Sequence, residues 1–151
     1  MKIAGAPITW GVNEVPGWGY QMTPERVLTE MKQIGLTATE FGPQGWRPID
    51  AQERADLVAQ YGLKPVGSFF LAVMHDPDFD PIPQVEQELE AFEAAGGEFL
   101  VLAADSGREG YDDRPVLNEE GWSTLFNNMS RIREVCATKG VTACIHPHWG
   151  T

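Results

Sequence analysis

The sequence predicts an α/β fold built on a parallel β-sheet, and three observations support this prediction. Short apolar runs of strand length alternate along the chain with segments whose apolar residues recur at helical spacing. Four of the helical patterns stop at a glycine, and a short apolar run then follows. No G-x-G-x-x-G motif follows the first strand, so the dinucleotide-binding version of such a fold lacks its fingerprint.

The first half of the chain contains two strand–helix units. Strands are predicted over residues 3–10 and 37–41. The first helix begins after Thr23, because Pro24 suits the first helical position. Asp50 is expected to cap the second helix, as in a capping box. The apolar stripe of the first helix consists of Val27, Leu28, Met31 and Ile34, and the two helices end before Gly35 and Gly62.

The second half repeats the pattern twice and adds a fifth strand. Strands are predicted over residues 64–73, 98–104 and 141–145. A third helix presents Val85, Leu89 and Phe92 on one stripe and ends at Gly96 or Gly97. Asn118 opens a fourth helix, which ends before Gly140. The residues of this helix expected to face inward are Trp122, Leu125, Phe126, Met129 and Ile132.

Five strands and four helices are too few for a closed (β/α)8 barrel, which typically takes about 250 residues. An open sheet of this kind exposes the backbone groups of its edge strands. Residues 1–151 are therefore interpreted as the N-terminal part of a single barrel domain, apparently truncated after the fifth strand. A natural half-barrel that pairs with a second chain is the alternative.

Composition narrows the range of partners. The chain is 42% hydrophobic and carries 11 basic against 22 acidic residues, a formal net charge of −11. Nucleic acids and anionic membranes attract Lys and Arg, so both are disfavoured as partners. The two cysteines, Cys136 and Cys144, form no C-x-x-C pair and lie in apolar surroundings, so they are interpreted as reduced thiols of a cytoplasmic protein.

Polar residues gather where the predicted strands end, which is where parallel α/β proteins place their active sites. We expect this region to contain the site, and each residue also has a purely structural interpretation. The alternative for Glu40 is a capped, solvated turn residue, and the alternative for His75 is an ordinary loop residue. The candidates from the first four strand ends are Trp10, Asn13, Glu40, His75 and Asp105.

His146 and His148 follow the fifth strand and are the strongest candidates. Side chains two residues apart in a strand point to the same face, so both imidazoles would meet one ion or one substrate. Pro147 stiffens the backbone between them. The alternative is a pair of structural histidines that bind loop carbonyls.

Three short motifs carry a resemblance to a known family. They are "APITWG" in the first strand, "TATEFGP" at the second and "HPHWGT" after the fifth. In this order they resemble the xylose isomerase-like barrel superfamily, and within it the inosose dehydratase group of sugar isomerase/epimerase-like proteins. The resemblance covers the whole chain but only about the first half of a family member.

The resemblance implies a single-domain barrel that holds one divalent metal ion, commonly Mn, Co, Mg or Zn. His146 or His148 would supply a ligand, and the other ligands would lie beyond Thr151. The implied substrate is a small keto-polyol or sugar. The metal polarises the carbonyl, and a histidine or carboxylate removes the neighbouring proton. In this scheme Glu40 orients a hydroxyl or a histidine, while His75 binds substrate or assists proton transfer.

Several readings of function remain open. Dehydration and isomerisation or epimerisation share the first proton abstraction. An apurinic-site endonuclease of the same superfamily is disfavoured by the charge of −11 and by only three histidines. A non-catalytic half-barrel would dimerise or aggregate through its open edges, so a second copy of the chain stays a possible partner. A polyol-binding protein without turnover would bind without metal.

Overall fold

A computed structural model describes residues 3–13, 15, 17–108 and 113–147 of the chain. Its centre is one five-stranded parallel sheet with the strand order β1-β2-β3-β4-β5, so every strand pairs with its neighbour in sequence. The elements are β1 (Ala4–Gly5), the 3-10 helix η1 (Pro7–Trp10), α1 (Pro24–Gln33), β2 (Ala38–Glu40), α2 (Ala51–Gln60), β3 (Lys64–Ala72), α3 (Ile82–Ala95), β4 (Phe99–Ala104), α4 (Glu119–Thr138) and β5 (Thr142–Ile145).

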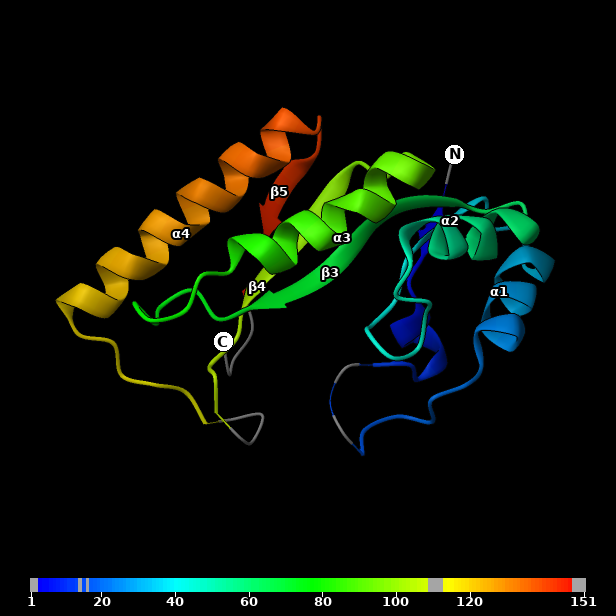
Figure 1. The fold of residues 1–151 in the computed structure, drawn as a ribbon. Helices are drawn as coiled ribbons and strands as arrows, with labels where there is room; N and C mark the ends of the chain where they lie inside the picture. The colour runs from blue at the N-terminus through cyan, green and yellow to red at the C-terminus, as the bar shows by residue number, and fades with distance from the viewer. Residues whose placement is uncertain (1–2, 14, 16, 109–112, 148–151) are drawn as a thin grey trace.

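The two faces of the sheet differ in how well they are covered. Helices pack against one face, as Figure 1 shows for α3 and α4. Phe70 on β3 and Leu102 on β4 are neighbours in register and lie buried in the core beneath these helices. Side chains alternate along a strand, so the residues between them point to the opposite face. On that face Phe69, Val101 and Cys144 are aligned in register and are only half-buried.

The predicted helix ends are confirmed. Asp50 accepts a hydrogen bond from the Glu53 N–H at 2.9 Å, and Asn118 accepts one from the Gly121 N–H at 2.9 Å. Pro24 is the first residue of α1. The glycines after the four helices all have the left-handed conformation that side chains resist. These are Gly35, Gly62, Gly96 and Gly140, with φ of 87°, 64°, 83° and 70°.

The first predicted strand is wrong in its second half. Residues 3–10 were expected to be extended throughout, but β1 covers only Ala4–Gly5, and Pro7–Trp10 form the 3-10 helix. Pro7 suits the start of a helix because its φ is fixed near the helical value. Gly11 then ends the turn in the left-handed region and donates its N–H to the Ile8 carbonyl at 3.0 Å.

The predicted inward face of α4 is wrong for its two largest aromatic residues. Trp122 and Phe126 are 49% and 58% exposed, and their rings stack on each other with centroids 5.7 Å apart. The buried line of the helix instead runs through Asn128, Ile132 and Cys136, which follow one another at intervals of four residues. The aromatic pair therefore lies off the buried line of the helix.

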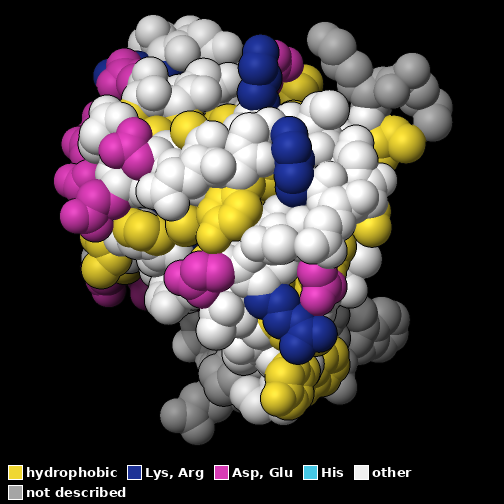
Figure 2. All heavy atoms as spheres, turned by 90° about the vertical axis from the view of Figure 1, so that its right-hand side faces the viewer, with side chains coloured by type: hydrophobic (Ala, Val, Ile, Leu, Met, Phe, Trp, Pro, Cys, Tyr) yellow, Lys and Arg dark blue, Asp and Glu magenta, His cyan; other side chains and the backbone are white. Residues whose placement is uncertain are grey.

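Both cysteines are free, as predicted. Cys136 is fully buried in the core, and burial raises the pKa of its thiol to about 11. None of the helices in the described residues combines the length and the apolar composition needed to cross a bilayer. On the face that carries α1 and α2, acidic side chains gather along one side while Lys and Arg side chains are scattered (Figure 2).

Candidate functional site

A cavity of about 700 Å³ opens at the carboxyl ends of the strands, and we call it the strand-end cavity. It lies on the face of the sheet opposite the helices, because Phe69 and Val101 form part of its floor. Loops after β1, β2 and β3 form its walls. Its polar lining consists of Glu40, Gln44, Arg47, Gln84, Asp105 and His146. Three of the predicted site residues, Glu40, Asp105 and His146, are thus brought together.

Glu40 reaches this cavity from the end of β2, next to an irregularity in the sheet. It is the last residue of β2, and the register between β2 and β3 shifts between Thr39 and Glu40, so that Glu40 lies opposite Gly67. A side chain at Gly67 would clash with the Phe99 carbonyl oxygen of the next strand. The close approach of the strands therefore requires glycine at this point. Glu40 points away from the side of the buried Thr39, because side chains alternate along β2.

His146 and Asp105 are held at the ends of adjacent strands. The His146 N–H donates to the Leu102 carbonyl at 2.9 Å, which extends the β4–β5 pairing by one bond. Its imidazole stands edge-on to the Phe69 ring, with centroids 5.4 Å apart and an interplanar angle of 85°. Asp105 accepts a hydrogen bond from the Gly107 N–H at 2.9 Å, which orients its carboxyl group.

His75 lines a second, more apolar cavity of about 470 Å³, which lies on the side of α4 and β5. Asp105 and His146 line both cavities and form the boundary between them. The backbone before His75 is fixed from α4, because Asn128 donates its side-chain N–H to the Met74 carbonyl at 2.9 Å. The half-buried His75 is therefore near the predicted site but in its neighbouring compartment.

Two predicted substrate residues, Trp10 and Asn13, are not among the described residues that line these cavities. The indole of Trp10 donates to Glu30 of α1 at 2.9 Å. Glu30 also accepts a hydrogen bond from Arg26. Both bonds lower the pKa of the Glu30 carboxyl group, and the bond from Arg26 has the larger effect. The Asn13 side chain accepts the N–H of Val15 at 2.8 Å and shapes its own loop. Both side chains thus have local structural partners.

The structure describes only one of the two predicted metal ligands, His146. His148 lies outside the described residues. Among the described residues, no three His, Cys, Asp or Glu side chains are grouped closely enough to hold a metal ion. The described stretch therefore offers His146, with the carboxyl groups of Glu40 and Asp105 in the same cavity, as at most a part of a ligand set.

A buried ion cluster behind the cavity was missed by the sequence interpretation. Glu88 of α3 accepts hydrogen bonds from Arg47 at 2.9 and 3.0 Å and from Arg54 of α2 at 2.9 Å. The three side chains are only 3–4% exposed. Arg47 also donates to the Gly42 carbonyl at 2.7 Å, so the cluster fixes the loop between β2 and α2. Burial lowers the pKa of Arg47, and Glu88 acts in the opposite direction.

A signal for this cluster is present in the sequence. Glu88 lies on the apolar stripe of α3, three residues after Val85 and one before Leu89. A carboxylate at such a position is almost never buried unless it is paired. The stripe thus indicates that a buried cation exists, although it does not identify which one.

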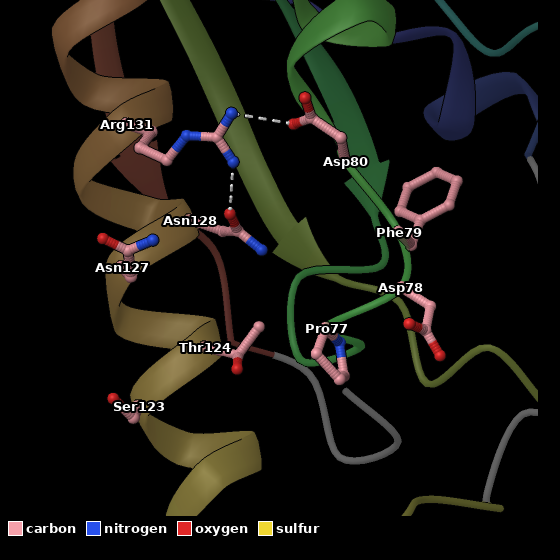
Figure 3. Close-up of a pocket in the computed structure, with 9 residues that line it drawn as sticks. All are labelled: Pro77, Asp78, Phe79, Asp80, Ser123, Thr124, Asn127, Asn128 and Arg131. Carbon is pink, nitrogen blue, oxygen red and sulfur yellow. Dashed lines mark hydrogen bonds and ion pairs between the residues drawn. The ribbon is translucent and has the colours of Figure 1, made fainter.

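A second polar cluster fastens the loop between β3 and α3 to α4. Arg131 binds Asp80 at 3.0 Å and Asn128 at 2.8 Å, as Figure 3 shows. Asn128 is buried, whereas the Arg131 and Asp80 side chains are 41% and 54% exposed. These residues line a polar hollow of about 470 Å³, and Phe79 lines both this hollow and the strand-end cavity. The loop that carries His75 is thereby held at both ends.

Comparison with known proteins identifies relatives of about twice the length. The chain is 25% identical over 159 aligned positions to an inosose dehydratase of Geobacillus thermodenitrificans, covering 100% of this chain and 53% of that protein. A solved structure of the IolI protein with a bound zinc atom superposes with a TM-score of 0.64 at 14% identity, over 97% of this chain and 51% of that one. A D-allulose 3-epimerase from Methylomonas sp., in complex with D-allulose, gives a TM-score of 0.63 at 14% identity, with coverage of 94% and 49%.

The chain thus spans about half the length of the curated relatives that it matches. Its sheet corresponds to part of a (β/α)8 barrel, as the sequence predicts, since the superposed structures are twice as long and the strand order is sequential and parallel. The family described as "Xylose isomerase-like TIM barrel" matches residues 28–151, which is most of the chain. The chain therefore belongs to the xylose isomerase-like TIM barrel family.

Proposed function

We propose that the complete protein is an enzyme that acts on a keto-polyol or keto-sugar, and that it dehydrates a keto-inositol in the manner of an inosose dehydratase. The observation that carries this proposal is the meeting of His146, Glu40 and Asp105 in one cavity at the strand ends. An imidazole and two carboxyl groups are suited to removing and returning protons. The similarity to an inosose dehydratase over the full length of the chain supports the choice of substrate.

The proposed reaction is an elimination next to a ketone. A base removes the proton from the carbon beside the carbonyl, and a carbon–carbon double bond forms. The hydroxyl group on the next carbon leaves after it takes a proton from an acid, so that water and an unsaturated ketone are produced. We assign His146 to proton transfer, and Glu40 and Asp105 to binding and orienting hydroxyl groups. His75 would contact the substrate from the neighbouring compartment.

For the complete enzyme we also propose one divalent metal ion, Mn, Co, Mg or Zn. Such an ion polarises a carbonyl and stabilises the negative charge that develops on its oxygen. His146 or His148 would supply this chain's ligand to the ion, and an imidazole bound to the ion would not also act as the base. His148 is therefore the ligand in the scheme in which His146 transfers the proton. The zinc atom in the IolI structure supports an ion in this family, and it is a property of that protein.

The proposal is tested with the natural-length protein and a keto-inositol. Turnover is followed by absorbance of the unsaturated ketone, and bound metal is measured by mass spectrometry. Replacing His146 and His148 together with alanine should remove most of the turnover and lower the metal content. If the doubly substituted protein keeps both at the wild-type level, the site at the fifth strand is wrong.

Isomerisation or epimerisation is the second candidate, because the solved D-allulose 3-epimerase has a similar fold. Both reactions begin with the same proton abstraction, so the same residues would serve. Product analysis in D₂O separates them, since an epimerase incorporates deuterium into a sugar of unchanged composition. A dehydratase loses water instead.

A third candidate, of another class, is a half-barrel that works only with a partner chain. The exposed Trp122, Phe126 and Ile145, together with the open edges at β1 and β5, favour it. Sedimentation of the purified chain distinguishes this candidate. A discrete dimer or mixed complex supports it, and a monomer of natural length with turnover contradicts it.

A further inference from the structure

Arg47 is the one member of the buried ion cluster that also lines the strand-end cavity. Only 7% of the residue is exposed. Its Nε donates to the Gly42 carbonyl, and its Nη2 donates to both oxygens of Glu88. These bonds fix the plane of the guanidinium group. Its orientation is therefore set before any ligand arrives.

The remaining nitrogen of Arg47, Nη1, has no hydrogen-bond partner among the described residues. In the same part of the chain, no side-chain nitrogen or oxygen is both fully buried and without a partner. Nη1 must therefore reach open space, and the space that Arg47 borders is the strand-end cavity. The guanidinium thus presents an unused donor to this cavity.

Arg54 differs from Arg47 in this respect. All three of its nitrogens are used, since they donate to the Pro48 carbonyl, to Glu88 and to the Ile49 carbonyl at 3.2, 2.9 and 3.0 Å. It does not line the strand-end cavity among the described residues. Two guanidinium groups share one carboxylate, so the cluster carries a formal charge of +1. Arg54 therefore has no nitrogen left to bind a ligand, whereas Arg47 has Nη1.

We propose that Arg47 is a specificity-determining residue, whose Nη1 binds a carbonyl or hydroxyl oxygen of an uncharged polyhydroxy substrate. This inference rests on the proposed function and names the substrate class. Glu40 and Asp105 line the same cavity as Arg47, so two hydrogen-bond acceptors share this space with its donor. A carboxylate or a dianionic phosphate group has no hydrogen to give to these two acceptors. A hydroxyl group fits, because it donates to a carboxylate while it accepts from Arg47.

The test measures ligand binding and turnover in the natural-length protein with Arg47→Lys and Arg47→Met. The probes are myo-inositol, myo-inositol monophosphate and a keto-inositol. Arg54→Lys is the matched control, because it disturbs the same cluster without touching the cavity. We expect both Arg47 variants to weaken myo-inositol binding and raise KM about tenfold, with kcat changed less than threefold. The Arg54 variant should lose stability but keep its KM within about twofold.

Guanidinium ion at millimolar concentration should restore part of the lost affinity of Arg47→Met, an effect that a purely structural role would not produce. Parallel shifts of Tm and KM in the Arg47 and Arg54 variants would overturn the inference. So would an Arg47 effect that is seen only with the monophosphate, because Arg47 would then bind an anion. If the wild-type protein binds myo-inositol but shows no turnover, the proposed function fails, and the binding ratios alone decide on Arg47. If it binds none of the probes, both proposals are wrong.

Discussion

The two loops that flank the strand-end cavity differ in the burial of the ion pairs that hold them. The loop after β2 is held by Arg47, Glu88 and Arg54, whose side chains are 3–4% exposed. The loop after β3 is held by the buried Asn128 and by an Arg131–Asp80 pair that is 41% and 54% exposed. A buried charge without its partner is costly, whereas an exposed ion pair contributes little. We therefore expect the β2 side to be rigid and the β3 side to open first.

Glu88→Ala should give the largest effect. It leaves two guanidinium groups buried beside each other without a counter-charge, and breaking a buried pair in this way costs about 3–5 kcal/mol. Urea unfolding of the purified protein measures the free energy of unfolding. Glu86→Ala removes an exposed carboxylate from the same helix and should cost no more than about 0.5 kcal/mol. A loss below about 1 kcal/mol for Glu88→Ala would remove the contrast between the two loops.

Asn128→Ala should have an intermediate effect. It leaves the Met74 carbonyl without its donor, and an unsatisfied buried group costs about 1–3 kcal/mol. Because the bond holds the backbone before His75, limited proteolysis within residues 75–81 should accelerate more than the global loss of stability explains. Asn127→Ala, an exposed neighbour on α4, is the control. Equal proteolysis of the two variants would mean that Asn128 does not hold the loop.

Asp80→Asn should have a small effect, about 0–1 kcal/mol, because water and salt already screen the exposed Arg131–Asp80 pair. Asparagine removes the charge but keeps a side-chain oxygen for the Ile82 N–H, which Asp80 accepts at 3.1 Å. The difference in the free energy of unfolding between the wild type and this variant should disappear in 0.5 M NaCl. The same salt should leave the effect of Glu88→Ala nearly unchanged, because buried pairs are screened much less. Equal salt sensitivity of the two variants would contradict the assigned difference in burial.

The exposed pair of Lys139 and Glu93 should give the smallest effect. The hydrogen bond from Lys139 to Glu93, 2.7 Å long, raises the pKa of the ammonium group. The stabilisation is fully present below the ordinary lysine pKa of about 10.4 and is lost as the pH rises through the higher folded value. Above the folded pKa of Lys139, the Tm of Lys139→Met should therefore equal that of the wild type. At neutral pH, its Tm should be only slightly lower. Thermal unfolding across pH 7–11 measures the difference.

Local signals in the sequence predicted most of the fold. The Gly62 and Gly140 turns and the Asp50 and Asn118 caps depend on residues next to them in the chain, and all were confirmed. The 3-10 turn at Pro7–Trp10 was missed because apolar residues there resemble a strand. The aromatic pair on α4 was placed inward because helical spacing alone does not say which of two adjacent stripes faces the sheet.

The candidate site was predicted only where it depends on strand ends. Glu40, Asp105 and His146 meet because parallel strands finish at one edge of the sheet. Arg47 and Glu88 are 41 positions apart, and Trp10 and Glu30 are 20 apart. A local sequence pattern does not identify hydrogen-bond partners that are so far apart in the chain. A polar residue on an apolar helix stripe, as at Glu88 and Asn128, is the one sequence signal that such a contact exists.

The two cysteines differ in burial, and this difference allows selective labelling. The core thiol of Cys136 has a pKa of about 11, so it stays protonated and inert toward alkylating reagents at neutral pH while the fold is intact. Cys144 is half-buried on the uncovered face, two residues before His146. Within residues 1–151, a thiol-reactive fluorophore should therefore label Cys144, next to the strand-end cavity, and spare Cys136. Substrate entry would then be recorded as a change in the emission of the fluorophore on Cys144.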